Sequence, residues 1–536
     1  MSNLHCRRRA PAAGAILLVC CLWSLGQSSA PSIPSLRLLD VLQSTLANQP
    51  AVHIQEQQVV SSRAVRQQAR GQFDTVVGTT LSQSRINNPL TLFNQEEAGL
   101  LGIITNNQVS NVTSLDIGAT KEYRNGVTIS PSLLTTRTTD NIYDIGGVNL
   151  STLAFQVTVP LLRGRGRNVV AATETAAGIE VEASLLDLNQ TISSLLWNTA
   201  SSYWNAVSAA RNLKVAQGSE ERGKIYVKNV QTLIAAGRVA GAEIHQVNAN
   251  LATRSAARIA AEQNLIAARQ QLALAMGLST DQMASVGMPM EDFPKDDRQG
   301  LAVLNSHSLQ EFFDLALERR ADYLAAMKRE MEQKVLLAPA RNATLPQLNL
   351  SLSSGYSSLE EGTGFVNYFG APGRAPRGPD VGAGITYQFR PSNNAAFGAL
   401  MLAQSNVRQA ELHTLQTSQN IMASVVTAVA GVRNAALQLQ KAREAVAASQ
   451  AALEGEREKY RLGVGQLVDV LTIEDKLTVA EQAEVATQLG YALALAQLRF
   501  ATGTIIEPDK TIQSVDREVF LTVPDPAGQK MPAGKE

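Results

Sequence analysis

Apolar residues recur every three or four positions over two very long stretches of the chain, residues 168–235 and 394–461. This spacing is typical of amphipathic α-helices that pack along one another as coiled coils. At 1.5 Å per residue each stretch would extend roughly 100 Å, which is the length of a shaft and exceeds any compact domain. A shorter helical pattern follows each one, over residues 241–275 and 467–501. The pattern therefore predicts two long antiparallel helical hairpins.

Glycines separate the two helices of each hairpin. Gly237 and Gly463 follow directly after the long helical patterns, and glycine is favoured just past a helix end because it adopts a left-handed conformation at little cost. The two glycines are 226 residues apart (463 − 237), and the same offset relates Gly277 to Gly503, which follow the shorter helices. We therefore interpret the chain as an internal duplication in which each half carries one hairpin with a tight tip.

A period of two replaces the helical period ahead of each long helix. Thr, Ser, Val and Leu alternate between polar and apolar within residues 73–161 and 347–389, which predicts half-buried strands. Four strands are expected in the first half and two in the second, over residues 73–85, 113–124, 127–138, 149–161, 347–357 and 381–389. Asn125-Gly126 suits a hairpin turn between the second and third strands, since both residues tolerate positive φ. The polar stretches between strands, 86–112, 139–148 and 362–379, are expected to be loops exposed to solvent.

These patterns give the domain organisation. We expect a first structural repeat at residues 31–277, a linker at 278–306, a second repeat at 307–503 and a loose C-terminal tail at 504–536. The linker and the tail are rich in Pro, Asp and Gly and have no hydrophobic period. Each repeat would run in the order helix, strands, long helix, tip and return helix.

Residues 1–30 have the composition of an export signal peptide. Three arginines precede an apolar stretch at residues 12–25 that ends in small residues. That stretch is shorter than the roughly 20 residues that cross a bilayer as a helix. All cysteines of the chain lie in this leader, at Cys6, Cys20 and Cys21. The exported chain would therefore contain neither a disulfide nor a reactive thiol, and no pair of small residues precedes Cys20 or Cys21 to favour a lipoprotein.

The remainder of the sequence contains no run of about 18 consecutive apolar residues, so a membrane-spanning helix is not expected. An exported membrane protein without such a helix has to cross the bilayer as a closed β-barrel, because lipid cannot satisfy the polar groups of an open sheet edge. A few strands per half cannot close a barrel within one chain. The residues therefore predict an α+β membrane protein whose β-barrel is closed by several copies, with a helical barrel continuous with it, and this object is a duct.

Charge and chemistry narrow the function further. The chain has 47 basic and 47 acidic residues, which argues against a nucleic acid partner, since such proteins usually carry a basic excess. Histidines are scattered without ligand spacing and no nucleophile motif occurs, so we expect no catalytic residue, no metal site and no cofactor. Residues 163–167, Arg-Gly-Arg-Gly-Arg, lack the βαβ unit of a phosphate loop and are interpreted as a strand-to-helix junction. The alternative to a duct is an exported trimeric coiled-coil fibre or adhesin, which does not account for strands at equivalent places in both halves.

Two motifs carry a resemblance to a known family. Val159-Pro160-Leu161-Leu162-Arg163-Gly164 precedes the first long helix, and Tyr460-Arg461-Leu462-Gly463 with Leu467-Val468-Asp469-Val470-Leu471 forms the second tip. With the leader and the two-fold repeat, the chain resembles the TolC-type outer membrane efflux proteins over residues 36–503. The resemblance implies a homotrimer in the outer membrane of a Gram-negative bacterium, with a β-barrel in the outer membrane lipid and an α-helical tunnel across the periplasm.

The resemblance also implies function and partners. It predicts a passive channel of a tripartite efflux or type I secretion system, which docks through its tips to a periplasmic adaptor (membrane fusion) protein and so to an inner-membrane pump of the RND, ABC or MFS type. The sequence does not specify the cargo or the pump class. One departure concerns the strands, because family members have two strands per half and the pattern in the first half here predicts four. The hairpin at residues 113–138 is then either an addition to the outer loop or barrel region, or a loop with a strand-like pattern.

Candidate site residues follow from the same resemblance. The tips that would dock to the adaptor comprise Gly237, Arg238, Val239, Leu462, Gly463 and Val464. The family's pore aperture maps to Tyr460, to Asp469, and by the 226 offset to Glu243, which pairs with Asp469. An arginine expected two residues after Gly463 is Gly465 here, so Arg238 or Arg461 would have to replace it. A second aspartate expected one turn after Asp469 is Thr472.

Overall fold

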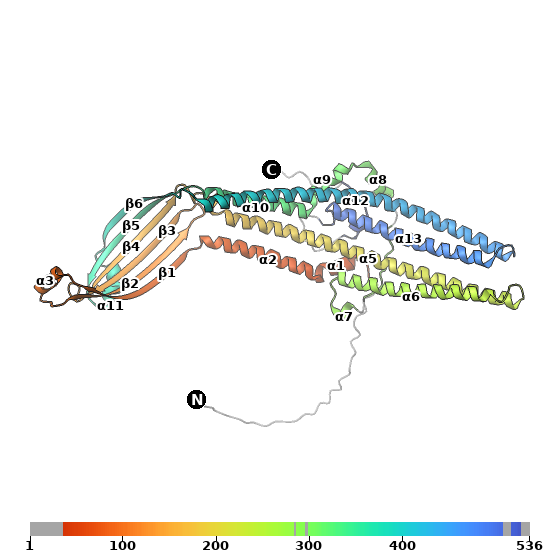
Figure 1. Cartoon of the computed structure of the whole chain (residues 1–536), viewed down its shortest axis with the longest axis horizontal. Helices are drawn as coiled ribbons and strands as arrows, with labels where there is room; N and C mark the ends of the chain where they lie inside the picture. The colour runs from red at the N-terminus through yellow and green to blue at the C-terminus, as the bar shows by residue number, and fades with distance from the viewer. Residues whose placement is uncertain (1–35, 284–285, 295–297, 507–515, 527–536) are drawn as a thin grey trace, which may run out of the picture.

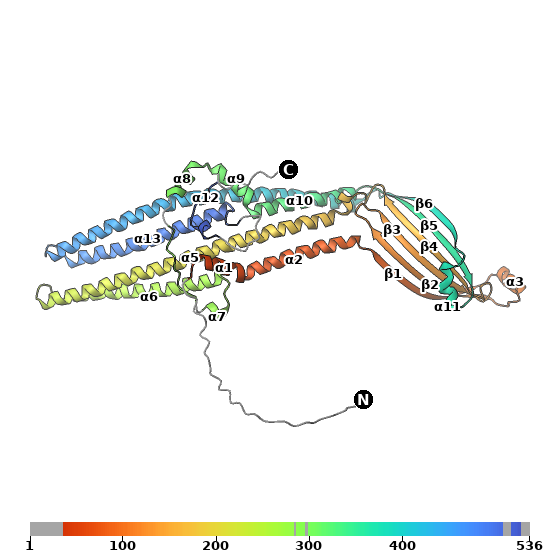
Figure 2. The same ribbon diagram turned by 180° about the vertical axis from the view of Figure 1, so that it is seen from behind.

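The computed structural model describes residues 36–283, 286–294, 298–506 and 516–526. The predicted signal peptide and the three cysteines lie outside these residues. The described chain forms a long rod, with a β-sheet at one end and the two hairpin tips at the other (Figure 1). The opposite view shows the same arrangement, with the paired helices side by side along the shaft (Figure 2).

The helices form two sets that belong to the two halves. The first set is α1 (Leu38–Asn48), α2 (Pro50–Arg70), α4 (Arg167–Val170), α5 (Ala172–Ala235) and α6 (Glu243–Ala275). The second set is α9 (Leu309–Arg319), α10 (Ala321–Asn342), α12 (Asn394–Arg461) and α13 (Leu467–Ala501). Pro50 stands at the first turn of α2, where its missing N–H costs nothing. Ala171 separates α4 from α5, so the first long helix begins four residues later than predicted.

The duplication is repeated in the way the helices end. The amide of Arg238 donates to the carbonyl of Leu233 at 3.0 Å, and the amide of Val464 donates to that of Lys459 at 3.0 Å. These bonds enclose Gly237 (φ +70°) and Gly463 (φ +80°), which form the left-handed C-cap known as a Schellman motif. The same bonding pattern closes α6 at Gly277 and α13 at Gly503. The hairpins therefore owe their equal geometry to the four glycines related by the 226-residue offset.

Six antiparallel strands form one sheet in sequence order. They are β1 (Val76–Pro89), β2 (Asn107–Glu122), β3 (Thr128–Thr139), β4 (Val148–Pro160), β5 (Gln347–Glu361) and β6 (Arg377–Gln388). The first half thus contributes four strands and the second half two, as the alternation predicts. Two predicted loops are partly helical instead. They contain α3 (Leu92–Leu100), and α11 (Phe365–Gly370) followed by the 3-10 turn η2 (Ala371–Gly373). Thr91 caps α3 by accepting a hydrogen bond from the amide of Asn94.

The two faces of the sheet differ in chemistry. Residues paired across antiparallel strands point to the same side, so the strand register assigns each residue to a face. One face is apolar and includes Leu81, Ile117, Leu133, Leu153, Phe155, Leu352 and Ile385. The opposite face is mainly polar or small and includes Thr80, Ser132, Thr152, Gln156, Ser351, Ser353 and Gly384. Apolar-out and polar-in alternation is the pattern of a strand that separates lipid from water.

The expected linker and tail hold structure that the sequence pattern did not predict. The linker contains the short helices α7 (Thr280–Met283) and α8 (Arg298–Ser306). In the tail, residues 516–526 fold onto the shaft through η3 (Arg517–Phe520), and the Phe520 side chain is fully buried. The prediction of a loose tail is therefore wrong for this segment, because one aromatic side chain finds a place in the core.

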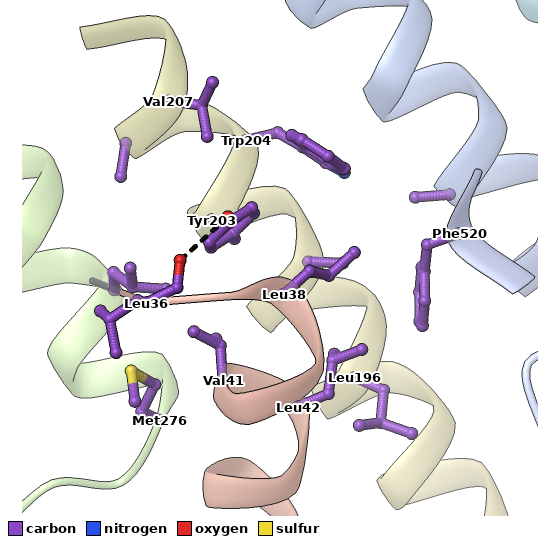
Figure 3. Packing of buried hydrophobic residues seen from close by; sticks show 14 of the residues in the cluster. Leu36, Leu38, Val41, Leu42, Leu196, Tyr203, Trp204, Val207, Met276 and Phe520 are labelled. Atoms are coloured by element: carbon purple, nitrogen blue, oxygen red, sulfur yellow. Dashed lines mark hydrogen bonds between the residues drawn. The ribbon is translucent and has the colours of Figure 1, made fainter. Parts of the chain in front are cut away.

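The main core lies at mid-shaft, where the N-terminal helix crosses α5. Tyr203 and Trp204 of α5 are fully buried against Leu36, Leu38 and Leu42, and Phe520 packs at the edge of the same cluster (Figure 3). The Tyr203 hydroxyl donates to the Leu36 carbonyl at 3.2 Å. A second hydrophobic cluster, mainly on α12 and α13, forms the core of the second half. Within the described residues, α12 contains one window that is long and apolar enough to cross a membrane, but this helix packs along α10 and α13, so we interpret it as part of the shaft.

Candidate functional site

The two hairpin tips lie together at the end of the rod farthest from the sheet (Figure 1). Leu462 and Val464 are 64% and 78% exposed at the second tip. Gly237 and Arg238 are exposed at the first tip, and Val239 is half-buried. Adding a Cβ to Gly237 or Gly463 would meet no atom within 4 Å, so only the positive φ demands glycine there. The tips thus present exposed apolar side chains at the end of the shaft.

Tyr460 and Glu243 come from different hairpins and lie near each other. Tyr460 packs against Val230 and Val247 of the first hairpin and Leu467 of its own. Burial, and the Glu243 carboxylate beside it, raise the pKa of the Tyr460 phenol. Its hydroxyl is buried and has no hydrogen-bond partner among the described residues. Within one protomer Tyr460 therefore acts through packing.

Within one protomer, neither of the arginines that could replace the absent arginine at Gly465 forms a hydrogen bond with the Tyr460 hydroxyl. Arg461 is held by Glu458 on its own helix, with N–O distances of 2.6 and 2.9 Å. Arg238 is exposed at the first tip. A Cβ at Gly465 would lie 3.0 Å from the Tyr460 amide nitrogen, so a larger residue would crowd the end of α12. Whether Arg238 or Arg461 replaces the absent arginine between protomers stays a prediction.

Asp469 lies in the first turn of α13 and is exposed. Val470 and Leu477 are buried on the seam of the same helix. Asp469 thus points away from the hairpin interface, as the helical pattern predicts. Thr472, one turn on, is also exposed, and its hydroxyl donates back to the Val468 carbonyl at 2.7 Å.

A buried ion cluster that the sequence analysis missed lies within the two hairpins, between the tips and mid-shaft. Glu474 of α13 is fully buried, with an exposed fraction of 0%. Three guanidinium groups surround it, from Arg222 of α5, Arg254 of α6 and Arg457 of α12. The distances are 3.7 Å for Arg254 and 3.1 Å for Arg457. We call Glu474 and these three arginines the Glu474 cluster.

The Glu474 cluster joins all four helices of the two hairpins. Tyr226 of α5 adds a bond from its hydroxyl to Glu474 at 3.3 Å and accepts one from Arg457 at 2.8 Å. Arg254 also donates to Asp475 at 2.9 Å and to the Ser219 carbonyl at 3.1 Å. A buried carboxylate that meets several guanidinium donors is held far more tightly than an exposed pair. The cluster therefore fastens the second hairpin to the first.

One signal in the sequence could have revealed this cluster. Glu474 falls on the apolar seam of α13, between Val470 and Leu477, where a charged residue needs buried partners. The 226 offset relates Glu474 to Asn248 and Arg222 to Ala448, so the cluster is not duplicated. The repeat that revealed the hairpins could not reveal a contact that only one half provides.

Comparison with known proteins identifies this architecture. The family model described as "Outer membrane efflux protein" matches residues 313–504. The chain is 25% identical over 379 residues to outer membrane protein TolC of Escherichia coli (strain K12), covering 68% of this chain and 72% of TolC. This chain is therefore similar to outer membrane efflux proteins, and the family match lies in its second half.

Solved structures of channels share the fold. The outer membrane channel CmeC of Campylobacter jejuni superposes with a TM-score of 0.60 at 16% identity, covering 88% of this chain and 86% of CmeC. The Neisseria gonorrhoeae MtrE outer membrane channel gives 0.58 at 18% identity, covering 87% and 89%. The predicted location in the outer membrane agrees with these comparisons, because the similar proteins are outer membrane proteins and channels. These relatives are described as channels and outer membrane proteins, and none of them is described as an enzyme or a fibre.

Replacement of Tyr460 with phenylalanine tests whether its hydroxyl closes the channel. Because the hydroxyl has no partner within the described protomer, we expect Tyr460→Phe to leave the single-channel conductance in planar bilayers unchanged. Tyr460→Ala would remove a packed ring between the hairpins and should increase channel opening. An increase in the phenylalanine variant as large as that in the alanine variant would mean that the hydroxyl forms a link in the assembly.

Proposed function

We propose that this protein is the outer membrane exit duct of a tripartite efflux or type I secretion system. Three copies would form one passive channel, with the sheets closed into a β-barrel in the outer membrane and the helices forming a tunnel across the periplasm. The observation that carries this proposal is the continuity of two unlike parts in one rod. A sheet with one apolar and one polar face is joined directly to duplicated helical hairpins that end in exposed tips.

Closure by several copies is supported by the free edges of the sheet. Strands β1 and β6 each pair on one side only among the described residues, and an unpaired edge cannot face lipid. The shaft also leaves large apolar side chains uncovered in a single protomer. On α12 these include Phe397, Met401, Leu402, Leu415 and Leu437. Apolar surface of this extent is expected to be buried between subunits.

Docking to a periplasmic adaptor, and through it to an inner-membrane pump, is supported by the tips. An exposed apolar knob on a rigid cap fits the groove between two helices of another hairpin. Three copies would present six such knobs, three of each kind. The duct itself would be passive, and the inner-membrane pump would supply the energy.

The tip glycines provide the direct test of this function. Gly463→Pro is expected to abolish export of cargo in cells while trimers still assemble, because proline cannot adopt φ +80° and lacks the amide that donates to Tyr460. Gly237→Trp should have the same effect through bulk on the exposed first tip. The matched control is Gly99→Trp at the other end of the rod, where a Cβ also meets no atom within 4 Å. Normal export by both tip variants would contradict docking through the tips.

Asp469 is proposed as a ring of three carboxylates at the aperture. Three like charges that converge in a narrow aqueous pore favour cations over anions. Reconstituted trimers should therefore be cation-selective in planar bilayers, and Asp469→Ala should reduce that selectivity. Asp469→Glu, which keeps the charge, should retain it. Because Thr472 stands one turn on, the ring is single and its block by multivalent cations should be weak. Equal selectivity in the alanine variant and the parent would exclude the ring.

A further inference from the structure

The hairpin formed by β2 and β3 lies in the middle of the first half's strands. β2 pairs with β1 in unbroken register from Val76–Thr120 to Pro89–Asn107. β3 pairs with β4 from Thr128–Thr158 to Thr138–Val148. The hairpin is therefore inserted between β1 and β4 along almost their whole length. It is neither a loop at the rim nor a flap across one face.

The hairpin continues the two-faced pattern of the strands beside it. Leu133 of β3 pairs with Ile117 and with Leu153, so the Leu133 side chain lies on the apolar face. Ser132, the preceding residue, pairs with Gly118 and with Ala154 on the polar face. A segment that projected into water on both sides would have no reason to alternate in phase with its neighbours. The hairpin thus has the chemistry of a strand pair between lipid and water.

The turn of the hairpin is fixed at the junction of sheet and shaft. Arg124 makes two bonds to Glu174 of α5, at 2.6 and 2.9 Å, and Arg70 of α2 reaches the same carboxylate at 3.2 Å. These bonds to arginine lower the pKa of Glu174. The amide of Gly166 donates to the Asn125 carbonyl at 3.1 Å. The turn is thereby clamped between the two helices that enter and leave the strands.

We propose that each protomer contributes six strands to the barrel, so that three copies close an eighteen-stranded exit with a wide lumen. This inference rests on the trimeric duct proposed above and adds the size and lining of its outer end. An even number of strands per protomer leaves β1 antiparallel to β6 of the next copy, so the ring closes without a parallel pair. Barrel diameter grows about linearly with strand number, so the exit would be roughly 1.5-fold wider than one built from four strands per protomer.

The lining indicates the class of cargo that such an exit admits. Side chains on the polar face of the hairpin are small hydroxyls such as Ser114, Ser132 and Thr136, with Asp116 among them. The same face also holds three exposed leucines, Leu134, Leu150 and Leu359, and the register places Arg377 on it opposite Ser357. A wide and mainly hydroxyl-lined exit suits bulky hydrophilic cargo, and the selective constriction of the duct is left to the tips.

Single cysteines test the position of the hairpin, because the exported chain is expected to have no cysteine of its own. Ser132→Cys and Leu133→Cys are compared with Ser351→Cys and Leu352→Cys on β5, in full-length trimers in lipid nanodiscs. The probes are a charged, water-soluble methanethiosulfonate and a lipid-soluble pyrene maleimide. We expect the charged probe to label both serine positions at least tenfold faster than both leucine positions, and the lipid-soluble probe to show the reverse. Electron-microscopic sections through the barrel should then show the diameter expected for eighteen strands.

The outcomes separate this inference from the duct itself. If alternation holds on β5 while Ser132 and Leu133 are labelled equally by the charged probe, the hairpin lies outside the barrel and the eighteen-stranded exit is wrong, but the duct stands. A section with the diameter of a twelve-stranded barrel would likewise contradict the eighteen-stranded exit and leave the duct standing. Loss of alternation on β5 as well would overturn the β-barrel on which both proposals depend.

Discussion

Replacing Glu474 with alanine is expected to destabilise the shaft by about 3–5 kcal/mol, which is the usual cost of removing one partner from a buried ion pair. The Glu474 side chain is fully buried. Its removal leaves Arg222, Arg254 and Arg457 facing one another without their shared carboxylate. Arg254 is 5% exposed and keeps its bonds to Asp475 and to the Ser219 carbonyl, so the loss falls mainly on Arg222 and Arg457. The repulsion acts between helices of different hairpins, so the tips should separate.

Two measurements check this expectation. Thermal unfolding of the purified trimer should begin at a lower temperature in Glu474→Ala, and channels in planar bilayers should open more often than those of the parent. Asp475→Ala is the matched control on the next residue, since its carboxylate is 52% exposed and its bond to Arg254 should contribute no more than about 1 kcal/mol. Glu474→Leu combined with Arg222→Leu should recover part of the lost stability, because an apolar pair avoids the unpaired charge. Equal opening by Glu474→Ala and Asp475→Ala would show that the cluster does not hold the hairpins closed.

The sequence predicted the hairpins because their determinants are local and repeated. Apolar spacing defines each helix, and glycine after the last turn defines each tip, so neither needs knowledge of the rest of the chain. The same holds for the strands, including the pair β2 and β3, whose alternation and Asn125-Gly126 turn are both short-range signals. Gly277 and Gly503 have a second role that the local pattern does not predict. A Cβ at either would lie within 3 Å of backbone atoms, at Gln49 and at Arg319, and this close approach between distant segments is invisible in the pattern.

The features that sequence analysis missed depend on single long-range contacts. Glu474 and Arg222 are 252 residues apart, and no spacing rule relates them. The helix α11 lies in a stretch rich in Gly and Pro that favours a loop, yet Tyr368 is buried and its hydroxyl donates to the Thr135 carbonyl at 3.1 Å. Arg137 lies over the Tyr368 ring, 5.0 Å from its centroid. These contacts between one buried aromatic side chain and the sheet stabilise a helix that the local composition does not favour.

Replacing Phe520 with alanine is the second change with a large expected effect. Phe520 is fully buried in the mid-shaft core, and truncating a buried phenylalanine typically costs about 3–5 kcal/mol. The segment that carries it is held by Arg499 of α13, which donates to the Thr522 carbonyl at 3.0 Å and to the Thr522 hydroxyl at 2.8 Å. Burial lowers the pKa of Arg499 to about 10, so it keeps its charge at neutral pH.

The position of this segment explains why a tail affects the whole shaft. Phe520 packs into the core of the first half and Val523 into that of the second, so residues 516–526 fasten the two halves at mid-shaft. Phe520→Ala should therefore lower the melting temperature of the trimer and expose the C-terminal segment to protease, whereas Glu518→Ala, on the exposed side of the same turn, should do neither. If Phe520→Ala has the same melting temperature as the parent while its tail is cleaved, the segment does not stabilise the shaft. A shared loss of melting temperature and protection would establish it as the fastening between the two repeats.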